Sequence, residues 1–445
     1  MTKAFDRFLM ARFSLIALLG LAAAAGCGDS DSPAGGLDGG GGSGGSDAGA
    51  NTDRSVTSDT TGSAESADRG ADADAGSDAG SDTEGDVTTS DGGGSGDGGG
   101  GAKIPVPPGE PVTAPAMTWT AVPVAGTLCR NSQMAGFGIN INPSADKLLI
   151  WLDGGGACFN GVTCSQNSSG WAVTNDNLNN SVKNNTVFSR ATDTNNPFKD
   201  WHMVYVPYCT GDVHSGANMS GQNGQPQMGQ ANFFKYLQRI IATFTGLKEV
   251  VLSGSSAGGF GATWNWMLTQ DAFGDVPVSL LDDSGPPMAP EYLSECLQVR
   301  VGKLWSWDKT AHPACGGCDA AAGKVVRPLV DTALARARTR YALLSYDEDG
   351  TIKNFFAFGQ DNCAGIDAFL PPATAPGKFP MGLAELGRHW MSSSHASLYV
   401  FKGAGHTFLR GDLSKIQTGT GPNMLDWVKK FLDKSDPWTN VFPAP

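Results

Sequence analysis

The stretch that most constrains the fold is Lys248–Met267, which reads KEVVLSGSSAGGFGATWNWM. Val250–Leu252 is a short apolar run, typical of a strand buried on both faces. Gly-Ser-Ser-Ala-Gly follows at once, and the segment after it is compatible with a helix. Strand, sharp turn and helix is the context that a G-x-S-x-G nucleophile elbow requires. The sequence therefore predicts Ser256 as an exposed nucleophile at a helix N-terminus, with the Ala257 N–H facing a developing oxyanion. The bare motif also occurs by chance in Gly/Ser-rich turns, so the rest of the chain has to support it.

The N-terminus has the pattern of an export signal. Three basic residues precede an apolar run, Phe13–Ala25, that is too short to span a membrane. The run leads into Ala-Gly-Cys27, which resembles a bacterial lipobox whose cysteine is lipidated; an ordinary signal peptide is the alternative. We expect residues 1–27 to be a lipoprotein signal peptide. The protein is then an outer-membrane or cell-surface lipoprotein, or secreted, with the lipid anchor as its only membrane contact.

Residues 28–102 are almost entirely Gly, Ser, Asp, Ala and Thr, without a single aromatic residue. Such a stretch buries too little apolar surface to offset its ordering entropy, so we expect a disordered linker. It carries sixteen acidic residues and two arginines, a net charge of −14, whereas the whole chain is −13. The acidity therefore belongs to the linker. The remaining charge is close to neutral and shows no basic stripe, which argues against nucleic acid as a partner.

Residues 103–445 are long enough for one sizeable α/β domain. Apolar runs that can form strands alternate with amphipathic stretches, which predicts a mostly parallel sheet flanked by helices. Helical periodicity marks Phe233–Phe244 and Met424–Phe431. The strand-like runs are Lys147–Leu152, His202–Val206, Glu249–Leu252, Val278–Leu281, Arg340–Leu344 and Ser397–Phe401. We expect a monomer.

The cysteine content agrees with export. Besides Cys27 there are eight cysteines, an even number that predicts up to four disulfides in an exported domain. Parity alone leaves 105 pairings open. Cys315-Gly-Gly-Cys318, close to His312, is compatible with a redox motif or half a metal site. Because a thioredoxin-like context and a second ligand pair are both missing, we favour a structural disulfide and no metal.

A second glycine-rich turn precedes the elbow in the chain. Leu149–Cys158 reads LIWLDGGGAC, a buried strand that runs into Asp153 and three glycines. Glycines directly after a strand let backbone N–H groups converge on one point, as in the HGGG-type oxyanion loop of esterases. A merely flexible turn would show the same composition. The order of the motifs favours the oxyanion loop, because in an α/β-hydrolase this loop precedes the nucleophile strand.

A catalytic acid and then a histidine base should follow the nucleophile in the chain. His406 lies in a Gly-rich loop after the apolar run Ser397–Phe401, where such a sheet presents its base, so it is the predicted base. Asp347 ends the strand-like run before that one and is the predicted acid, with Asp283 as runner-up. His389 and His395 flank a predicted helix end and are expected on the surface.

Taken together, the motifs resemble those of the pectin acetylesterase and Notum family of carboxylesterases. The matching segments are LDGGGACFNGVTC, VPYCTGDVHSG, VVLSGSSAGGFGATWN, LLDDSG, SYDE and GHTF. The resemblance implies an α/β-hydrolase fold with Ser256 as nucleophile, Asp347 as acid and His406 as base. It also implies oxyanion donors at the N–H groups of Gly155, Gly156 and Ala257, and disulfides Cys129–Cys209 and Cys158–Cys164. It does not indicate how the other four cysteines pair.

The chain departs from the family pattern at two positions. Gly156-Ala157 stands where relatives usually have a tryptophan after the glycines, which removes an aromatic wall. His214 stands where relatives carry a bulky residue beside the cleft, so it is a candidate substrate contact; a hydrogen-bonded loop residue is the alternative. Both departures weaken any transfer of substrate from the family.

The implied reaction is acyl transfer from an ester to Ser256 and then to water, which needs no metal or cofactor. We expect a secreted serine carboxylesterase that removes O-acyl groups, foremost O-acetyl, from a polysaccharide such as pectin. The first alternative is Notum-like removal of a fatty acyl group from protein or lipid, which would need a deep apolar pocket. The second is a catalytically inactive surface binding lipoprotein. A strained elbow has no use in a pure binder, which argues against the last.

Overall fold

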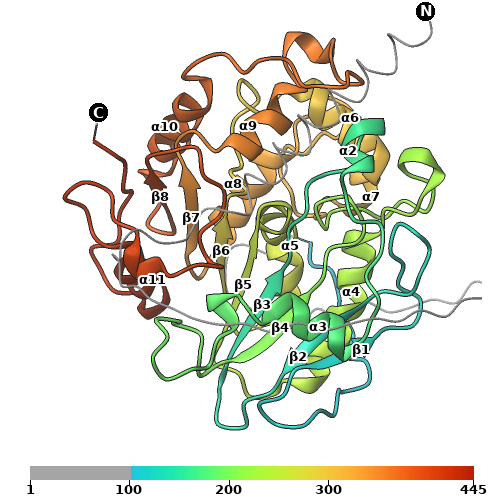
Figure 1. The fold of residues 1–445 in the computed structure, drawn as a ribbon, viewed down its shortest axis with the longest axis vertical. Coiled ribbons are helices and arrows are strands. Elements are labelled where there is room, and N and C mark those ends of the chain that lie inside the picture. The colour runs from blue at the N-terminus through green and yellow to red at the C-terminus, as the bar shows by residue number, and fades with distance from the viewer. Residues whose placement is uncertain (1–101, 445) are drawn as a thin grey trace, which may run out of the picture. The chain divides into compact units, whose positions relative to one another are not determined.

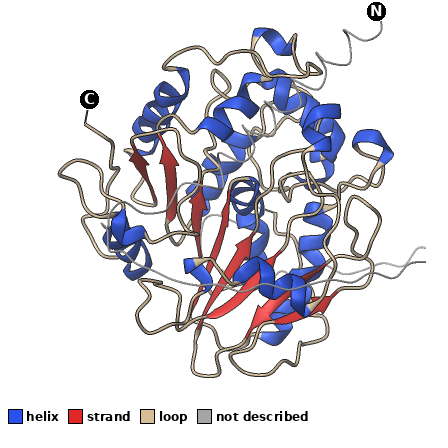
Figure 2. Ribbon diagram, in the orientation of Figure 1, coloured by secondary structure: helices blue, strands red, loops and turns tan. Residues whose placement is uncertain are grey.

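All six predicted strand-like runs form strands of one sheet in the computed structural model, which describes residues 102–444 (Figures 1 and 2). The predicted signal peptide, Cys27 and all but the last residue of the predicted linker lie outside the described residues. The strands are β1 (Thr120–Pro123), β2 (Gly136–Asn140), β3 (Lys147–Leu152), β4 (His202–Val206), β5 (Glu249–Ser255), β6 (Val278–Asp283), β7 (Tyr341–Tyr346) and β8 (Ala396–Phe401).

The strand order is β1-β2-β4-β3-β5-β6-β7-β8, and every pair from β4 to β8 is parallel. The sheet is therefore mostly parallel, as the alternation of the sequence predicts. Two antiparallel strands at one edge, β1 and β2, were not expected. β2 contains Gly136 and Gly138, which lack the β-branched or aromatic side chains that mark a strand in a sequence. Gly138 is needed there because a Cβ would overlap with the Leu178 side chain.

Helices cover both faces of the sheet (Figure 2). The α-helices are α2 (Gly161–Ser165), α3 (Asn175–Val182), α4 (Gly229–Thr243), α5 (Ala257–Phe273), α6 (Glu295–Trp305), α7 (Trp307–Thr310), α8 (Val326–Arg336), α9 (Gly350–Ala357), α10 (Lys378–Trp390) and α11 (Met424–Asp433). The 3-10 helices are η1 (Thr186–Phe188), η2 (Gln222–Gly224), η3 (Asp361–Cys363) and η4 (Leu413–Lys415). Helices predicted at 233–244 and 424–431 correspond to α4 and α11.

Alternate residues of the strands enter two different cores. Leu148 and Ile150 of β3 pack with α4, α5, α6, α8 and α10, whereas Leu149 and Trp151 of the same strand pack with α3 and α11. This follows from the period of two along a strand, which sends successive side chains to opposite faces. A sheet buried on both faces explains why its strands read as continuous apolar runs.

Four disulfides link the eight cysteines of the described residues. Cys129–Cys209 and Cys158–Cys164 are the pairs that the family resemblance implies, and Cys296–Cys363 and Cys315–Cys318 are the pairs it left open. The C-x-x-C motif is thus a disulfide, and no cluster of metal-ligating side chains occurs within residues 102–444. The bridges are consistent with export. Among the same residues, no helix is both long and apolar enough to cross a membrane.

Candidate active site

Ser256 occupies the sharp turn between β5 and α5, as the elbow motif predicts. Its backbone has φ +59° and ψ −122°, a conformation that is strained for a non-glycine residue. The turn is held by the Ser256 N–H, which donates to the carbonyl of Asp283 at 2.7 Å. Gly258 permits the turn, because a Cβ there would overlap with the carbonyl of Leu152. The hydroxyl of Ser256 therefore stands at the N-terminus of α5 and lines a cavity.

His406 is paired with a carboxylate, but not with the predicted one. Its Nδ1 lies 2.8 Å from Oδ2 of Asp349, which is fully buried. The other oxygen of Asp349 caps α9 by accepting from the N–H groups of Thr351 and Ile352, both at 2.9 Å. The carboxylate is thus fixed by a helix terminus on one side and holds the imidazole on the other. Nδ1 then carries the proton, which leaves Nε2 of His406 as an acceptor.

Asp347, the predicted acid, has a different role. Its Oδ1 accepts from the N–H of Gly403 at 2.7 Å, and its own N–H donates to Phe401, so it ties the ends of β7 and β8 together. The prediction placed the acid directly after the strand-like run, and β7 does end at Tyr346, but the carboxylate that pairs with His406 lies two residues beyond Asp347, at the N-cap of α9. Asp349 directly before the helical segment from Gly350 is an N-cap signal that could have identified it.

Asp283, the runner-up, connects the elbow with the loop of His406. Its Oδ2 accepts from the Ser255 hydroxyl at 2.6 Å and from the Leu409 N–H at 3.0 Å, while Oδ1 accepts from the Phe408 N–H at 2.9 Å. Burial raises the pKa of Asp283, and these hydrogen bonds together with His406 oppose the rise. Its oxygens are therefore occupied by groups on either side of the site. No hydrogen bond joins Ser256 to His406 among the described residues, although this network brings their two loops together.

The predicted oxyanion loop follows β3 and is shaped by its glycines. Gly156 has φ +83°, a region that favours glycine. Within the described chain, the N–H groups of Gly155 and Gly156 have no hydrogen-bond partner, and the N–H of Ala257 lies in the first turn of α5, where helical N–H groups lack intrahelical partners. Gly156, Ala257 and Ser256 all line the same cavity, whereas Gly155 does not. Of the three predicted donors, Gly156 and Ala257 are therefore the ones next to a ligand at Ser256.

His214 is a buried loop residue instead of a substrate contact. Its Nε2 donates to the carbonyl of Asp153 at 2.8 Å, and only 3% of the residue is exposed. Burial lowers the pKa of His214 to about 4, so the ring is neutral at pH 7. Its neighbour Val213, not His214, lines the cavity. The structure therefore corrects the expectation that His214 contacts substrate and favours the alternative of a hydrogen-bonded loop residue.

The cavity beside Ser256 is strongly apolar and has a volume of about 100 Å³. Apart from Ser256, its only hydroxyl or amide side chains belong to Thr263 and Gln298. Aromatic side chains from distant parts of the chain dominate the wall: Phe159, Phe260, Trp264, Trp305, Trp307, Phe355 and Phe356. Phe355 of α9 lies where a Cβ of residue 156 would touch it, at 3.4 Å. An aromatic wall next to the glycine loop is thus supplied by α9, although the usual tryptophan is missing.

The mostly parallel sheet has a glycine loop after β3 and a strained serine elbow after β5. A buried carboxylate–histidine pair, Asp349 and His406, follows later in the chain. These features define the α/β-hydrolase class. Comparison with solved structures agrees with this fold. The Wnt deacylase Notum from Drosophila superposes with a TM-score of 0.55 at 19% identity, covering 74% of this chain and 97% of that one.

Sequence comparison reaches the same group of proteins. Residues 115–295 match the family model of Pectinacetylesterase. The palmitoleoyl-protein carboxylesterases notum2 of Xenopus laevis and NOTUM of Mus musculus are 29% and 27% identical over 188 and 173 residues, which is 38% and 35% of this chain. The matches span 37% and 33% of those relatives, about a third of their length. The resemblance to the pectin acetylesterase and Notum family is therefore confirmed.

Proposed function

We propose that this protein is a serine carboxylesterase that holds the acyl group of its substrate in the apolar cavity beside Ser256. The observation that carries the proposal is the position of Ser256: its side chain lines a cavity with an almost wholly apolar wall, together with two of the predicted oxyanion donors. A hydrocarbon chain placed there would have its ester carbonyl next to the nucleophile.

In the proposed mechanism, Ser256 Oγ attacks the ester carbonyl and passes its proton to Nε2 of His406. Asp349 holds the imidazole in the required tautomer and stabilises the imidazolium that forms. The N–H groups of Gly156 and Ala257, with that of Gly155 in the same loop, would stabilise the oxyanion, a contribution of about 3–4 kcal/mol for each donor. His406 then protonates the departing alcohol, and water releases the acid from Ser256.

The chemistry of the wall favours an acyl chain longer than acetyl. Each buried CH₂ group contributes about 0.8 kcal/mol, and an acetyl group offers only a methyl to a wall built from seven aromatic side chains. The related notum2 and NOTUM proteins are named palmitoleoyl-protein carboxylesterases, and a long acyl chain such as palmitoleoyl is compatible with such a wall. Removal of acetyl groups from a polysaccharide, which the family match at residues 115–295 favours, is the second candidate.

Hydrolysis of p-nitrophenyl esters from acetate to palmitate by the full-length, oxidised protein tests the proposal. We expect kcat/KM to rise from acetate to medium-chain esters, and we expect Ser256→Ala to lose turnover while its circular dichroism stays unchanged. Cleavage restricted to acetate would move the assignment to the polysaccharide deacetylase. A folded protein that cleaves no ester, or a Ser256→Ala variant with an unchanged rate, would contradict the proposal and favour a binding protein.

A further inference from the structure

Three side chains other than those of Ser256, His406 and Asp349 bind carbonyl groups of the glycine loop and of Asp153 before it. His214 Nε2 donates to the carbonyl of Asp153 at 2.8 Å, Asn167 Nδ2 to that of Gly155 at 2.5 Å, and the Tyr208 hydroxyl to that of Gly156 at 2.9 Å. Tyr208 and His214 belong to the loop after β4, and Asn167 follows α2, so side chains from two other segments fix the glycine loop.

The direction of each carbonyl determines the direction of an oxyanion donor. A peptide group is planar and trans, so its C=O and its N–H point in opposite directions. The carbonyl of Gly155 and the N–H of Gly156 belong to one peptide group. A hydrogen bond from Asn167 to that carbonyl therefore aims the Gly156 N–H at the opposite side, where Gly156 and Ser256 line the cavity. Tyr208 orients the next peptide group in the same way.

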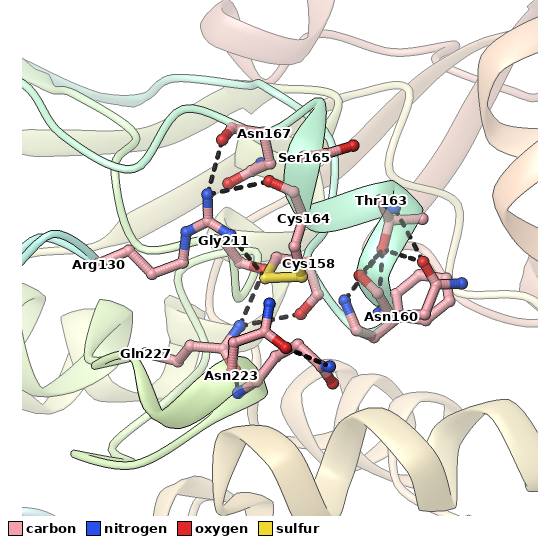
Figure 3. The surroundings of a disulfide bond; sticks show 12 residues. Arg130, Cys158, Asn160, Thr163, Cys164, Ser165, Asn167, Gly211, Asn223 and Gln227 are labelled. Atoms are coloured by element: carbon pink, nitrogen blue, oxygen red, sulfur yellow. Dashed lines mark hydrogen bonds between the residues drawn. A yellow bond between two sulfur atoms is a disulfide. The ribbon is translucent and has the colours of Figure 1, made fainter. Parts of the chain in front are cut away.

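Asn167 is itself held by the short Cys158–Cys164 loop (Figure 3). The buried guanidinium of Arg130 donates to the Asn167 carbonyl at 2.7 Å, to the Cys164 carbonyl at 3.2 Å and to the Cys158 sulfur at 2.7 Å. Figure 3 shows Arg130 reaching from one side to all three groups. Cys158 and Gly211 are also joined, through the Cys158 N–H at 2.7 Å. The backbone that carries Asn167 is thus fixed to the same disulfide that ends the glycine loop.

Tyr208 is equally constrained. Its hydroxyl accepts from the Val213 N–H at 2.8 Å while it donates to Gly156, so both hydrogen-bonding roles of the group are used. Burial raises the pKa of Tyr208 well above its ordinary value, which keeps it a neutral donor. Its ring also lies 4.8 Å from that of His214. The two residues therefore support neighbouring parts of the same loop.

We infer that Asn167 and Tyr208 are positioning residues for the esterase reaction and do not touch the substrate. Asn167 aims the Gly156 N–H at the oxyanion, and Tyr208 aims the N–H of Ala157, a cavity-lining residue that adds a further donor to those of the proposed mechanism. This inference rests on the proposed function. An oxyanion donor acts on the transition state and hardly on the bound ester. Loss of its orientation should therefore lower kcat and leave KM nearly unchanged.

The test compares Asn167→Ala and Tyr208→Phe with Asn232→Ala in the full-length, oxidised protein. Asn232 is a matched control: its buried amide also donates to a backbone carbonyl, that of Leu128 at 2.8 Å, but outside the glycine loop. For the first two variants we expect kcat on a p-nitrophenyl ester to fall about 10- to 100-fold with little change in KM, somewhat less than the loss of a whole donor. Asn232→Ala should keep its kcat.

A second measurement separates orientation from general damage. An alkylboronic acid forms a tetrahedral adduct with the nucleophilic serine, and one of its oxygens occupies the oxyanion position. Its affinity should fall in parallel with kcat in Asn167→Ala and Tyr208→Phe, at melting temperatures no lower than that of Asn232→Ala. Unchanged kcat in both variants, or equal losses in Asn232→Ala, would overturn the inference while an active wild type still upholds the esterase. An inactive wild type would refute the esterase itself and with it this role of Asn167.

Discussion

At the residue scale, the decisive difference within the site is between two aspartates only two positions apart. Asp349 binds Nδ1 of His406 and is fully buried, whereas Asp347 binds the backbone of Gly403. Only a carboxylate on Nδ1 can set the tautomer of the histidine and stabilise its positive charge during the reaction. The two residues therefore provide a matched pair for mutagenesis.

We expect Asp349→Asn to lower kcat by about 10⁴-fold, because an amide at this place favours the wrong histidine tautomer. Asp347→Asn should stay within a few-fold of the wild type, since an amide oxygen still accepts the hydrogen bond from Gly403. Steady-state kinetics on a p-nitrophenyl ester decides between them. A severe loss in Asp347→Asn with an active Asp349→Asn would restore the acid predicted from the sequence.

A site residue can be predicted from the sequence when the residues that position it are its neighbours in the chain. Ser256 and the glycines act through their immediate neighbours, so a local motif is sufficient to find them. Asp349 is selected by where β7 ends and α9 begins, a matter of two residues that apolar patterning does not resolve. The burial of His214 depends on contacts with Asp153 and Asn265, which no local pattern contains.

At the scale of elements, the disulfides differ in what they close. Cys129–Cys209 joins the segment before β2 to the end of β4 across 80 residues, whereas Cys158–Cys164 closes a loop of 6. In the chain-entropy account, a bridge lowers the conformational entropy of the unfolded chain. The resulting stabilisation grows with the logarithm of the loop length. The long bridge should therefore stabilise the fold more, and the short one should act mainly on local geometry.

We expect Cys129→Ala/Cys209→Ala to lower the free energy of unfolding by about 4–5 kcal/mol and Cys158→Ala/Cys164→Ala by about 2 kcal/mol. The order should reverse for activity, because the short bridge holds the segment that continues to Asn167, whose amide binds the glycine loop. Chemical denaturation and kcat measured on both double variants, with an ester substrate, provide the check. If Cys158→Ala/Cys164→Ala lowers the free energy of unfolding but keeps the wild-type kcat, this bridge supports the structure alone.

The sequence predicts the ends of the parallel strands to within three residues, and those of β3 and β4 without error, because each strand is buried on both faces and reads as one apolar run. It does not predict β1 and β2: β1 pairs with β2 and β2 with β4, and this pairing depends on tertiary contact more than on composition. Among the shorter helices, α7 is a single turn of four residues, too short to show helical periodicity. Strands and helices with a full hydrophobic pattern are thus predictable. The edge strands β1 and β2 and the short helix α7, which lines the cavity, are not.

At the scale of the whole molecule, the cavity is a property of packing that no single segment carries. Its wall combines the glycine loop with side chains of α5, α6, α7, α8 and α9, which are up to two hundred residues apart in the chain. This explains why the sequence alone left the choice between acetyl and longer acyl groups open. The side chains deep in these helices should then set the acyl-chain preference.

Leu329 of α8 offers the sharpest test, because it lines the cavity and is only 2% exposed. Leu329→Ala should enlarge the cavity and move the optimum of kcat/KM along the p-nitrophenyl ester series toward longer chains. Leu383→Ala is the control: Leu383 is 1% exposed in α10 but does not line the cavity. Both variants should lose about 2–5 kcal/mol of stability, since each leaves a void in the core. If chain preference shifts equally in both, or in neither, the cavity does not hold the acyl chain, and its apolar wall serves the stability of the fold alone.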